Sequence, residues 1–227
     1  SYIKFKKTKI VATLGPGCGN KTMLTRLIKA GVNVFRINFS HATYEEVDRH
    51  VELIRSLNKE LDTNVAILAD LQGPKIRVGK MEDGVVFKKG DEFILSTEKE
   101  IIGNKHKASL SYKDFAKDVK KGDRLLVDDG KLIFEVISTN KKDEVKLRNI
   151  QGGKLSSKKG VNLPNTKIST PSLTKKDKKD LLYAISKELD WVALSFVRDA
   201  NDMINLRKII EKESVSYTHL RAHETRL

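Results

Sequence analysis

The spacing of apolar residues predicts that the chain begins with alternating strands and helices. Short apolar runs predict strands at 9–14, 32–38 and 65–71, whereas apolar residues three and four positions apart predict helices at 21–30 and 43–60. The third strand is apolar throughout, which is typical of a strand covered on both faces. The second helix starts with Thr43 three residues before Glu46, the pattern of a capping box. Its apolar stripe consists of Val47, Val51, Ile54 and Leu57.

From Gly73-Pro74 onward the pattern changes to short alternating runs separated by turn residues. These runs predict the strands of a small barrel or sandwich. They are residues 85–87, 92–95, 124–127, 132–137 and 145–148. After Pro171 the first pattern returns, with a helix at 174–187, a strand at 191–196 and a helix at 200–213. The helix at 174–187 is expected to turn Leu181, Leu182 and Ile185 inward.

These elements predict an all-β domain, residues 74–170, inserted into an α/β domain made of 1–73 and 171–213. Four parallel strands with helices between them are either half of a (β/α)₈ barrel or a short doubly wound sheet. Polar residues lie at the predicted carboxyl ends of the strands, where barrel enzymes place their sites. They are Thr13, residues 36–41, residues 70–72 and residues 195–196. The predicted fold is therefore α/β, a partial (β/α)₈ TIM barrel of the first four strands with an inserted small all-β barrel.

The most informative polar cluster ends the second strand. Strand alternation places Arg36, Asn38 and Ser40 on one side, with His41 directly after them. A guanidinium beside several oxygen ligands suits a phosphoryl group with an accompanying cation. Asp70, at the end of the third strand, needs a partner, since an isolated buried charge is costly. Arg36 or Lys75 could provide it, and a simple ion pair at the domain junction is the alternative interpretation.

Four further motifs favour ordinary structural interpretations when each is taken alone. Residues 15–19 match neither the dinucleotide nor the P-loop pattern and indicate a plain turn. The glycine- and lysine-rich stretch 152–160 could meet phosphates, but a solvated turn is favoured. Asp128-Asp129-Gly130 indicates a hairpin turn. His219 and His223 are one helical turn apart, yet no third strong ligand accompanies them, so a metal site is not favoured.

Composition narrows the classes of protein. The chain has 44 basic and 30 acidic residues, a net charge of +14, of which residues 74–170 hold 22 basic and 14 acidic. Aromatic residues are only 6%, which disfavours a single-strand nucleic-acid binder and favours a lysine-rich solvated surface. We expect no membrane span, no signal peptide and no disulfide framework, since Cys18 is the single cysteine. A cytoplasmic protein is the expectation.

Taken in order, five sequence blocks resemble the pyruvate kinase family. The blocks are residues 7–16, 33–41, 73–77, 157–164 and 173–198, and the resemblance covers 7–213. It implies a barrel interrupted by a mobile β lid. It also implies transfer of the phosphoryl group of phosphoenolpyruvate to ADP with Mg²⁺, yielding pyruvate and ATP. For the intact protein it implies a homotetramer, with neither nucleic acid nor membrane as a partner.

The resemblance also implies residue roles. Arg36 would hold the substrate phosphate. The nucleotide would be faced by Asn38, Phe39, Ser40, His41, Arg77 and Lys159. K⁺ would be bound by Asn38, Ser40, Asp70 and the Leu71 carbonyl. Here Leu71 and Lys75 stand where many family members have threonine and glutamate. A fixed ammonium at position 75 could replace K⁺, so we expect a protein that works without it.

The last segment departs from the family. Residues 214–227 are unlike the next barrel strand, and we expect a disordered or artefactual tail. The catalytic lysine and the Mg²⁺ ligands of the family would follow that point, so none is assigned here and the chain by itself is expected to be inactive. Two alternatives stay open: another phosphoenolpyruvate- or pyruvate-handling barrel enzyme, or a basic nucleic-acid-binding protein.

Overall fold

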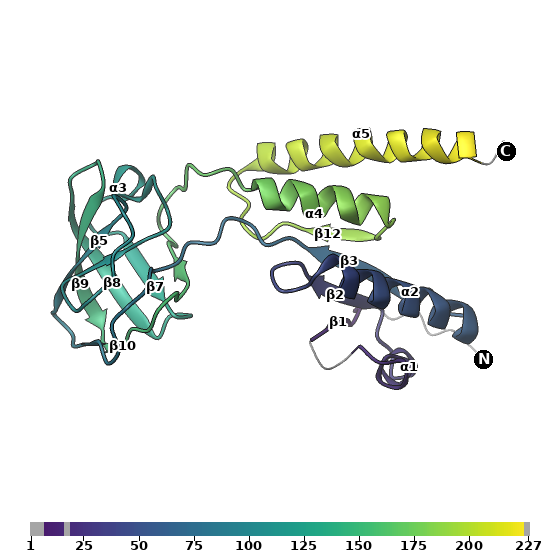
Figure 1. Cartoon of the computed structure of the whole chain (residues 1–227), viewed down its shortest axis with the longest axis horizontal. Helices are drawn as coiled ribbons and strands as arrows, with labels where there is room; N and C mark the ends of the chain where they lie inside the picture. The colour runs from purple at the N-terminus through teal and green to yellow at the C-terminus, as the bar shows by residue number, and fades with distance from the viewer. Residues whose placement is uncertain (1–6, 16–18, 225–227) are drawn as a thin grey trace. The chain divides into compact units, whose positions relative to one another are not determined.

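The computed structural model describes residues 7–15 and 19–224, with side chains through residue 216. It divides into two compact units (Figure 1). The α/β unit consists of Ser1–Gly73 with Ser172–Leu227, and the β unit consists of Pro74–Pro171. Each unit has its own hydrophobic core, because no core cluster of the described residues combines side chains from both. No described helix combines the length and the apolar character needed to cross a membrane.

The α/β unit is built on a four-stranded parallel sheet. Its strands are β1 (Val11–Thr13), β2 (Val34–Asn38), β3 (Ala66–Asp70) and β12 (Trp191–Ala193), and they lie in the order β1-β2-β3-β12. All three pairings are parallel, so the carboxyl ends meet at one edge of the sheet. The strand predicted at 191–196 is shorter, because its neighbour β3 ends at Asp70, the register partner of Ala193.

Burial alternates along the central strands, which corrects the expectation that both faces of the third strand are covered. In β3 Ile67 and Ala69 are buried, whereas Ala66, Leu68 and Asp70 are only half-buried. The buried residues belong to the core formed with the helices, together with Phe35 and Ile37 of β2. The other face of the sheet is therefore the one that presents polar side chains.

The described residues of this unit form four helices. They are α1 (Lys21–Lys29), α2 (Tyr44–Leu61), α4 (Lys175–Ser186) and α5 (Ala200–Glu224). The predicted stripe of α2 is fully buried, and its capping box between Thr43 and Glu46 is confirmed. Helix α4 starts with the same device, between Thr174 and Asp177. The expectation for α4 was wrong at Leu182, which is 40% exposed, because the buried stripe passes through Asp177, Asp180, Leu181 and Ala184 instead.

Helix α5 also corrects the sequence-based expectation. It was predicted to end at residue 213 and to be followed by a disordered tail, yet it continues to Glu224. The segment after Ser214 contains neither glycine nor proline up to that point, so no residue in it stops a helix. His219 and His223 lie on this extension, where the structure does not describe side chains.

The β unit contains a six-stranded sheet in the order β11-β7-β8-β9-β5-β6 and a two-stranded sheet of β4 and β10. Its strands are β4 (Val86–Phe87), β5 (Glu92–Ser96), β6 (Lys107–Ser109), β7 (Arg124–Val127), β8 (Leu132–Thr139), β9 (Glu144–Gln151), β10 (Gly153–Lys154) and β11 (Val161–Asn162), and one short helix, α3 (Phe115–Asp118), lies between β6 and β7. The core centres on Phe87, Phe93 and Phe134, whose ring centroids lie 4.8–5.5 Å apart. The sequence did not predict β6, β10, β11 or α3, because two to four residues are too few to show a period.

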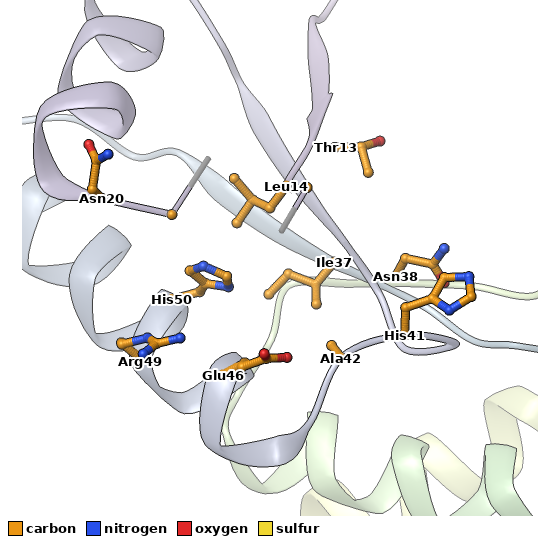
Figure 2. A pocket seen from close by; sticks show the side chains of 12 residues that line it. Thr13, Leu14, Asn20, Ile37, Asn38, His41, Ala42, Glu46, Arg49 and His50 are labelled. Carbon is orange, nitrogen blue, oxygen red and sulfur yellow. The ribbon is translucent and has the colours of Figure 1, made fainter. Parts of the chain in front are cut away.

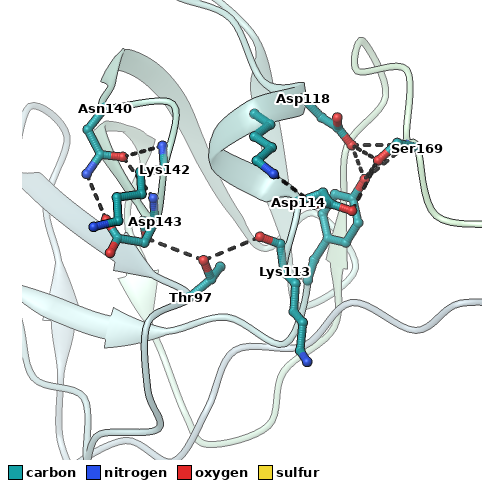
Figure 3. Close-up of polar contacts among 10 residues, drawn as sticks. Thr97, Lys113, Asp114, Asp118, Asn140, Lys142, Asp143 and Ser169 are labelled. Carbon is teal, nitrogen blue, oxygen red and sulfur yellow. Dashed lines mark hydrogen bonds and ion pairs between the residues drawn. The ribbon is translucent and has the colours of Figure 1, made fainter.

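Side-chain hydrogen bonds fix the irregular segments of the β unit (Figure 3). The Ser169 N–H donates to the Tyr112 hydroxyl at 3.0 Å and to Asp118 Oδ2 at 3.0 Å, which attaches the last residues of the unit to α3. The turn between β8 and β9 closes on Asn140, whose Oδ1 accepts the backbone N–H groups of Lys142 and Asp143, each at 2.9 Å. Both attachments are polar contacts that hydrophobic periodicity does not reveal.

Candidate functional site

A charged group lies at the carboxyl edge of the parallel sheet. Arg36 is the register partner of Thr13 on one side, and Asn38 is the register partner of Asp70 on the other. The Arg36 Nε donates to Asp70 Oδ2 at 2.8 Å, its Nη2 donates to the same oxygen, and its Nη1 donates to Thr13 Oγ1 at 3.1 Å. Of the two partners considered for Asp70, the structure therefore shows Arg36.

The remaining donors of Arg36 define what this group can bind. A guanidinium has five N–H donors, and the contacts just given use three of them. Within the described residues the other two have no protein partner, and the side chain is 32% exposed. Asp70, with 14% of its side chain exposed, fixes the orientation of the guanidinium. The arrangement leaves a positioned cation with two free donors, which suits a phosphate or a carboxylate.

The segment after β2 is held in one conformation by its own polar groups. Asn38 Oδ1 accepts the Ser40 N–H at 3.0 Å, and the Asn38 carbonyl accepts the His41 N–H at 3.3 Å. The Phe39 N–H donates to the Asp70 carbonyl at 3.0 Å. We call residues 38–41 the β2 loop.

The side chain of Phe39, a member of the implied nucleotide set, lies in the hydrophobic core. It is 1% exposed, and its ring meets the Tyr183 ring edge-on at 6.2 Å. Strand alternation explains this, because Phe39 points to the opposite face from Asn38 and Ser40. Only the backbone of Phe39 can take part in the site.

A pocket opens beside the β2 loop, between the end of β1 and helix α2 (Figure 2). Asn38 and His41 line one side of it, and Glu46, Arg49 and His50 of α2 line another. The remaining lining residues are Thr13, Leu14, Gly15, Gly19, Asn20, Ile37 and Ala42. Pro16–Cys18, which complete the glycine-rich turn considered above, lie outside the described residues.

The α2 side of the pocket was missed by sequence reasoning. Burial, followed by the positive charge of Arg49, lowers the pKa of His50 below its usual value, while Glu46 opposes this. His50 is therefore neutral at neutral pH and can both donate and accept a hydrogen bond. Glu46, Arg49 and His50 lie three and four positions apart, a spacing that places side chains on the same side of a helix. A search of α2 for ionisable residues at that spacing would have found them.

Arg77 and Lys159 belong to the β unit. Arg77 forms an isolated antiparallel bridge with Gly160, and its Nη1 donates to the Lys158 carbonyl at 2.8 Å. The Lys159 ammonium lies 3.6 Å from Asp128 Oδ1, in the turn between β7 and β8. The structure thus brings two of the implied nucleotide residues onto adjacent segments, although 82 positions separate them in the sequence.

The implied cation ligands lie where the ends of β2, β3 and β12 meet. The Leu71 side chain is buried, and its carbonyl accepts the Ser195 hydroxyl at 3.3 Å. By residue type, the implied set of Asn38, Ser40, Asp70 and the Leu71 carbonyl offers oxygen ligands and one carboxylate. Lys75, the suggested replacement for that cation, belongs to the β unit.

Mg²⁺ is different. Across residues 7–15 and 19–216, no group of three or more acidic, histidine or cysteine side chains is arranged to hold a metal ion.

Comparison with known proteins assigns the family. Residues 5–223 match the family described as "Pyruvate kinase, barrel domain", so the match runs past Ser214, where we expected the resemblance to end. The chain is 41% identical over 211 residues to the pyruvate kinase of Staphylococcus haemolyticus and 40% identical over 213 residues to that of Staphylococcus aureus. These alignments cover 92% and 93% of this chain but only 36% of each relative.

A solved structure gives the same result. A crystal structure of a pyruvate kinase from Cryptosporidium parvum superposes with a TM-score of 0.85 at 33% identity, covering 89% of this chain and 42% of that one. The partial parallel barrel and the inserted β half-barrel thus both match a known architecture. By sequence and by structure, this chain belongs to the pyruvate kinase family.

Proposed function

We propose that this chain holds the phosphate and the nucleotide in a site that transfers the phosphoryl group of phosphoenolpyruvate to ADP, giving pyruvate and ATP. The observation that carries the proposal is the fixed position of the Arg36 guanidinium. It is fixed by Asp70 and Thr13 at the carboxyl edge of the sheet and keeps two donors available. Family membership supports the assignment of the substrate.

The residues act mainly by positioning. Phosphoryl transfer needs oxygen charge to be neutralised and the two substrates to be aligned, and it asks for little covalent chemistry from the protein. Arg36 would bind two oxygens of the substrate phosphate through its two remaining donors. Asp70 keeps the guanidinium from rotating away, because two of its N–H groups are bound to a single carboxylate oxygen.

The nucleotide would lie against the β2 loop and the neighbouring pocket. Asn38, Ser40 and His41 supply an amide, a hydroxyl and an imidazole, and His41 and Asn38 line the pocket. Arg77 and Lys159 would add two cations from the β unit, which would exclude water if that unit closes as a lid. Phe39 contributes only its backbone.

The family uses K⁺ and Mg²⁺. Asn38, Ser40, Asp70 and the Leu71 carbonyl would hold K⁺, unless the Lys75 ammonium makes it dispensable as we propose. Mg²⁺ supplies positive charge to the phosphoryl oxygens when it is bound. Its ligands and the catalytic lysine, as the resemblance implies them, are not among these 227 residues, so we propose that this polypeptide by itself does not turn over. The intact enzyme is proposed to be a cytoplasmic homotetramer.

Binding tests the proposal. Titration calorimetry of the chain with phosphoenolpyruvate should show saturable binding that Arg36→Lys weakens by about tenfold, because lysine keeps the charge but loses the planar fork. Arg26→Lys, on the exposed face of α1, is the matched control and should bind as the wild type does. Equal affinity of Arg36→Lys and the wild type would contradict the assignment.

Turnover is tested separately. Pyruvate formation from phosphoenolpyruvate, ADP and Mg²⁺ should stay at the level of a protein-free blank. Mg²⁺-dependent pyruvate formation by the purified chain would show that the inactivity proposal is wrong, while leaving the binding role of Arg36 intact.

A further inference from the structure

Helix α4 contacts the β2 loop at Phe39, and a lysine makes its polar contact there. The Lys176 ammonium donates to the Phe39 carbonyl at 2.8 Å and to Asp180 Oδ2 at 2.5 Å. Lys176 and Phe39 are 137 positions apart in the sequence. The contact therefore joins the loop that carries the proposed nucleotide residues to a helix that follows the inserted β unit in the chain.

Asp180 holds this lysine in place. The carboxylate is 3% exposed, and its second oxygen accepts the Tyr44 hydroxyl at 2.6 Å. A carboxylate this deeply buried needs partners on both oxygens, because desolvation is otherwise uncompensated. Lys176 and Tyr44 meet that need from α4 and from the first residue of α2. The ammonium is thus directed toward the Phe39 carbonyl by a buried anion.

Aromatic side chains restrain Phe39 at its ring, whereas Lys176 contacts its carbonyl. The Phe39 ring lies edge-on to Tyr183, and Tyr183 stacks on Tyr44 at 4.2 Å with an interplanar angle of 10°. The Tyr183 hydroxyl donates to Asp48 and, at 3.1 Å, to the Tyr44 carbonyl. Phe39 is therefore held at its ring by the tyrosine pair, at its N–H by Asp70 and at its carbonyl by Lys176.

The carbonyl contact matters for the residues that follow it. The Phe39 carbonyl belongs to the peptide that leads into Ser40, and it marks the point where the β2 loop leaves the strand ladder. Rotation of that peptide would move the Ser40 and His41 N–H groups away from Asn38. The described contacts include one side-chain donor to this carbonyl, and it is Lys176.

We propose that Lys176 is a positioning residue for the nucleotide: through the Phe39 carbonyl it fixes Asn38, Ser40 and His41 in the conformation that binds ADP. The identity of the nucleotide as ADP rests on the proposed function. The effect of Lys176 on the conformation of the β2 loop is a property of the chain alone. Lys176 itself touches no substrate in this proposal.

The test begins without any ligand. Amide hydrogen exchange of Ser40 and His41, followed by NMR, should be about tenfold faster in Lys176→Met than in the wild type. Lys178→Met is the matched control, because it removes the same charge from an exposed position of α4. It should leave both exchange rates unchanged. Lys176→Arg, which keeps a cationic donor, should restore most of the protection.

A second variant separates positioning from stability. Lys176→Met leaves the buried Asp180 without its cation and can lower stability for that reason alone. The double variant Lys176→Met with Asp180→Asn removes the unpaired charge while keeping an acceptor for Tyr44. We expect it to melt within a few degrees of the wild type and still to show fast exchange at Ser40 and His41. Recovery of both properties together would overturn the inference.

Nucleotide binding completes the test. The Kd for ADP should rise about three- to tenfold in Lys176→Met and in the double variant, and it should be unchanged in Lys178→Met. A wild-type chain that fails to bind ADP would overturn the proposed function. Unchanged exchange at Ser40 and His41 in Lys176→Met would instead overturn the positioning role, so the two failures are distinguishable.

Discussion

The guanidinium of Arg36 and the carboxylate of Asp70 form a two-donor contact across the ends of β2 and β3, 34 positions apart in the sequence. Both donors, Nε and Nη2, reach the same oxygen of Asp70. The pair is partly shielded from water and lies beside the β2 loop. The same contact therefore contributes to the stability of the sheet edge and fixes the orientation of Arg36, which we propose binds the substrate phosphate.

Asp70→Asn should lower the free energy of unfolding of the α/β unit by about 1–3 kcal/mol, because the amide removes the charge that the half-buried guanidinium faces. Urea unfolding followed by the fluorescence of Trp191, the single tryptophan, reports on this unit. Asp62→Asn is the control, since Asp62 is exposed and asparagine accepts its left-handed conformation. A wild-type transition for Asp70→Asn would show that the contact contributes nothing to stability.

The stability of the β unit should depend on pH through Asp118. Burial raises the pKa of this carboxyl, but hydrogen bonds from Tyr112 and Ser169 outweigh burial and hold the pKa below its usual value of 3.8. A carboxyl whose pKa is lower in the folded than in the unfolded state stabilises the fold at pH values above its unfolded-state pKa. This stabilisation is lost as the pH falls through the folded-state pKa. The difference in unfolding free energy between wild type and Asp118→Asn should therefore shrink below about pH 4.

Circular dichroism during urea unfolding at several pH values measures this difference. Asp83→Asn, in the exposed turn before Gly84, is the control for a surface carboxylate of the same unit. If the difference in unfolding free energy between the wild type and Asp118→Asn stays constant from pH 7 to below about pH 4, the assigned hydrogen bonds are contradicted.

Gly152→Ala should destabilise the β unit by about 1–3 kcal/mol. A Cβ at this position would lie 2.4 Å from the Phe87 carbonyl oxygen, so β4 and β10 would have to separate. Gly160→Ala is the matched control, because a Cβ there meets nothing within 4 Å. Thermal unfolding of the two variants should give a lower Tm for position 152 only, and equal values would refute the steric argument.

The melting temperature of the chain should be the same in KCl as in tetramethylammonium chloride at equal ionic strength, if the Lys75 ammonium replaces K⁺. Lys75→Glu replaces that ammonium with the carboxylate that the family resemblance implies, so this variant should gain a K⁺-dependent rise in Tm. A K⁺-specific rise already present in the wild type would show that the cation is needed here as well.

Limited proteolysis should leave the β unit, Pro74–Pro171, as the longer-lived fragment. In the α/β unit the outer strands β1 and β12 each have one paired neighbour in the described sheet, and short edge strands open easily. Thermolysin, which does not depend on the abundant lysines, is the suitable protease, with mass spectrometry of the fragments. Equal lifetimes for fragments of both units would contradict the expectation.

The sequence predicted the features that depend on period and on strand ends. Parallel strands place their carboxyl ends together, which was sufficient to expect Arg36 near Asp70, and local patterns were sufficient for the capping box at Thr43. The β7–β8 hairpin turn at Asp128-Asp129-Gly130 also follows from local residues and is confirmed.

The remaining features depend on tertiary contacts or on rules that the prediction did not apply. The contact of Lys176 with Phe39 needs the packing of α4 beside α2, which no local pattern encodes. The buried position of the Phe39 side chain follows from strand alternation, which was applied to Arg36, Asn38 and Ser40 but not extended to Phe39. Helix α5 was ended too early because the change in sequence character after residue 213 was taken for a change in structure.

The order β1-β2-β3-β12 has a practical consequence for work with this polypeptide. Each outer strand has a row of backbone N–H and C=O groups that no described residue pairs, and Val11 and Trp191 on these strands are 52% and 59% exposed. Open edges with exposed apolar residues promote association between copies. Protein concentration is therefore a variable to control, and dilute samples will report most directly on the single chain.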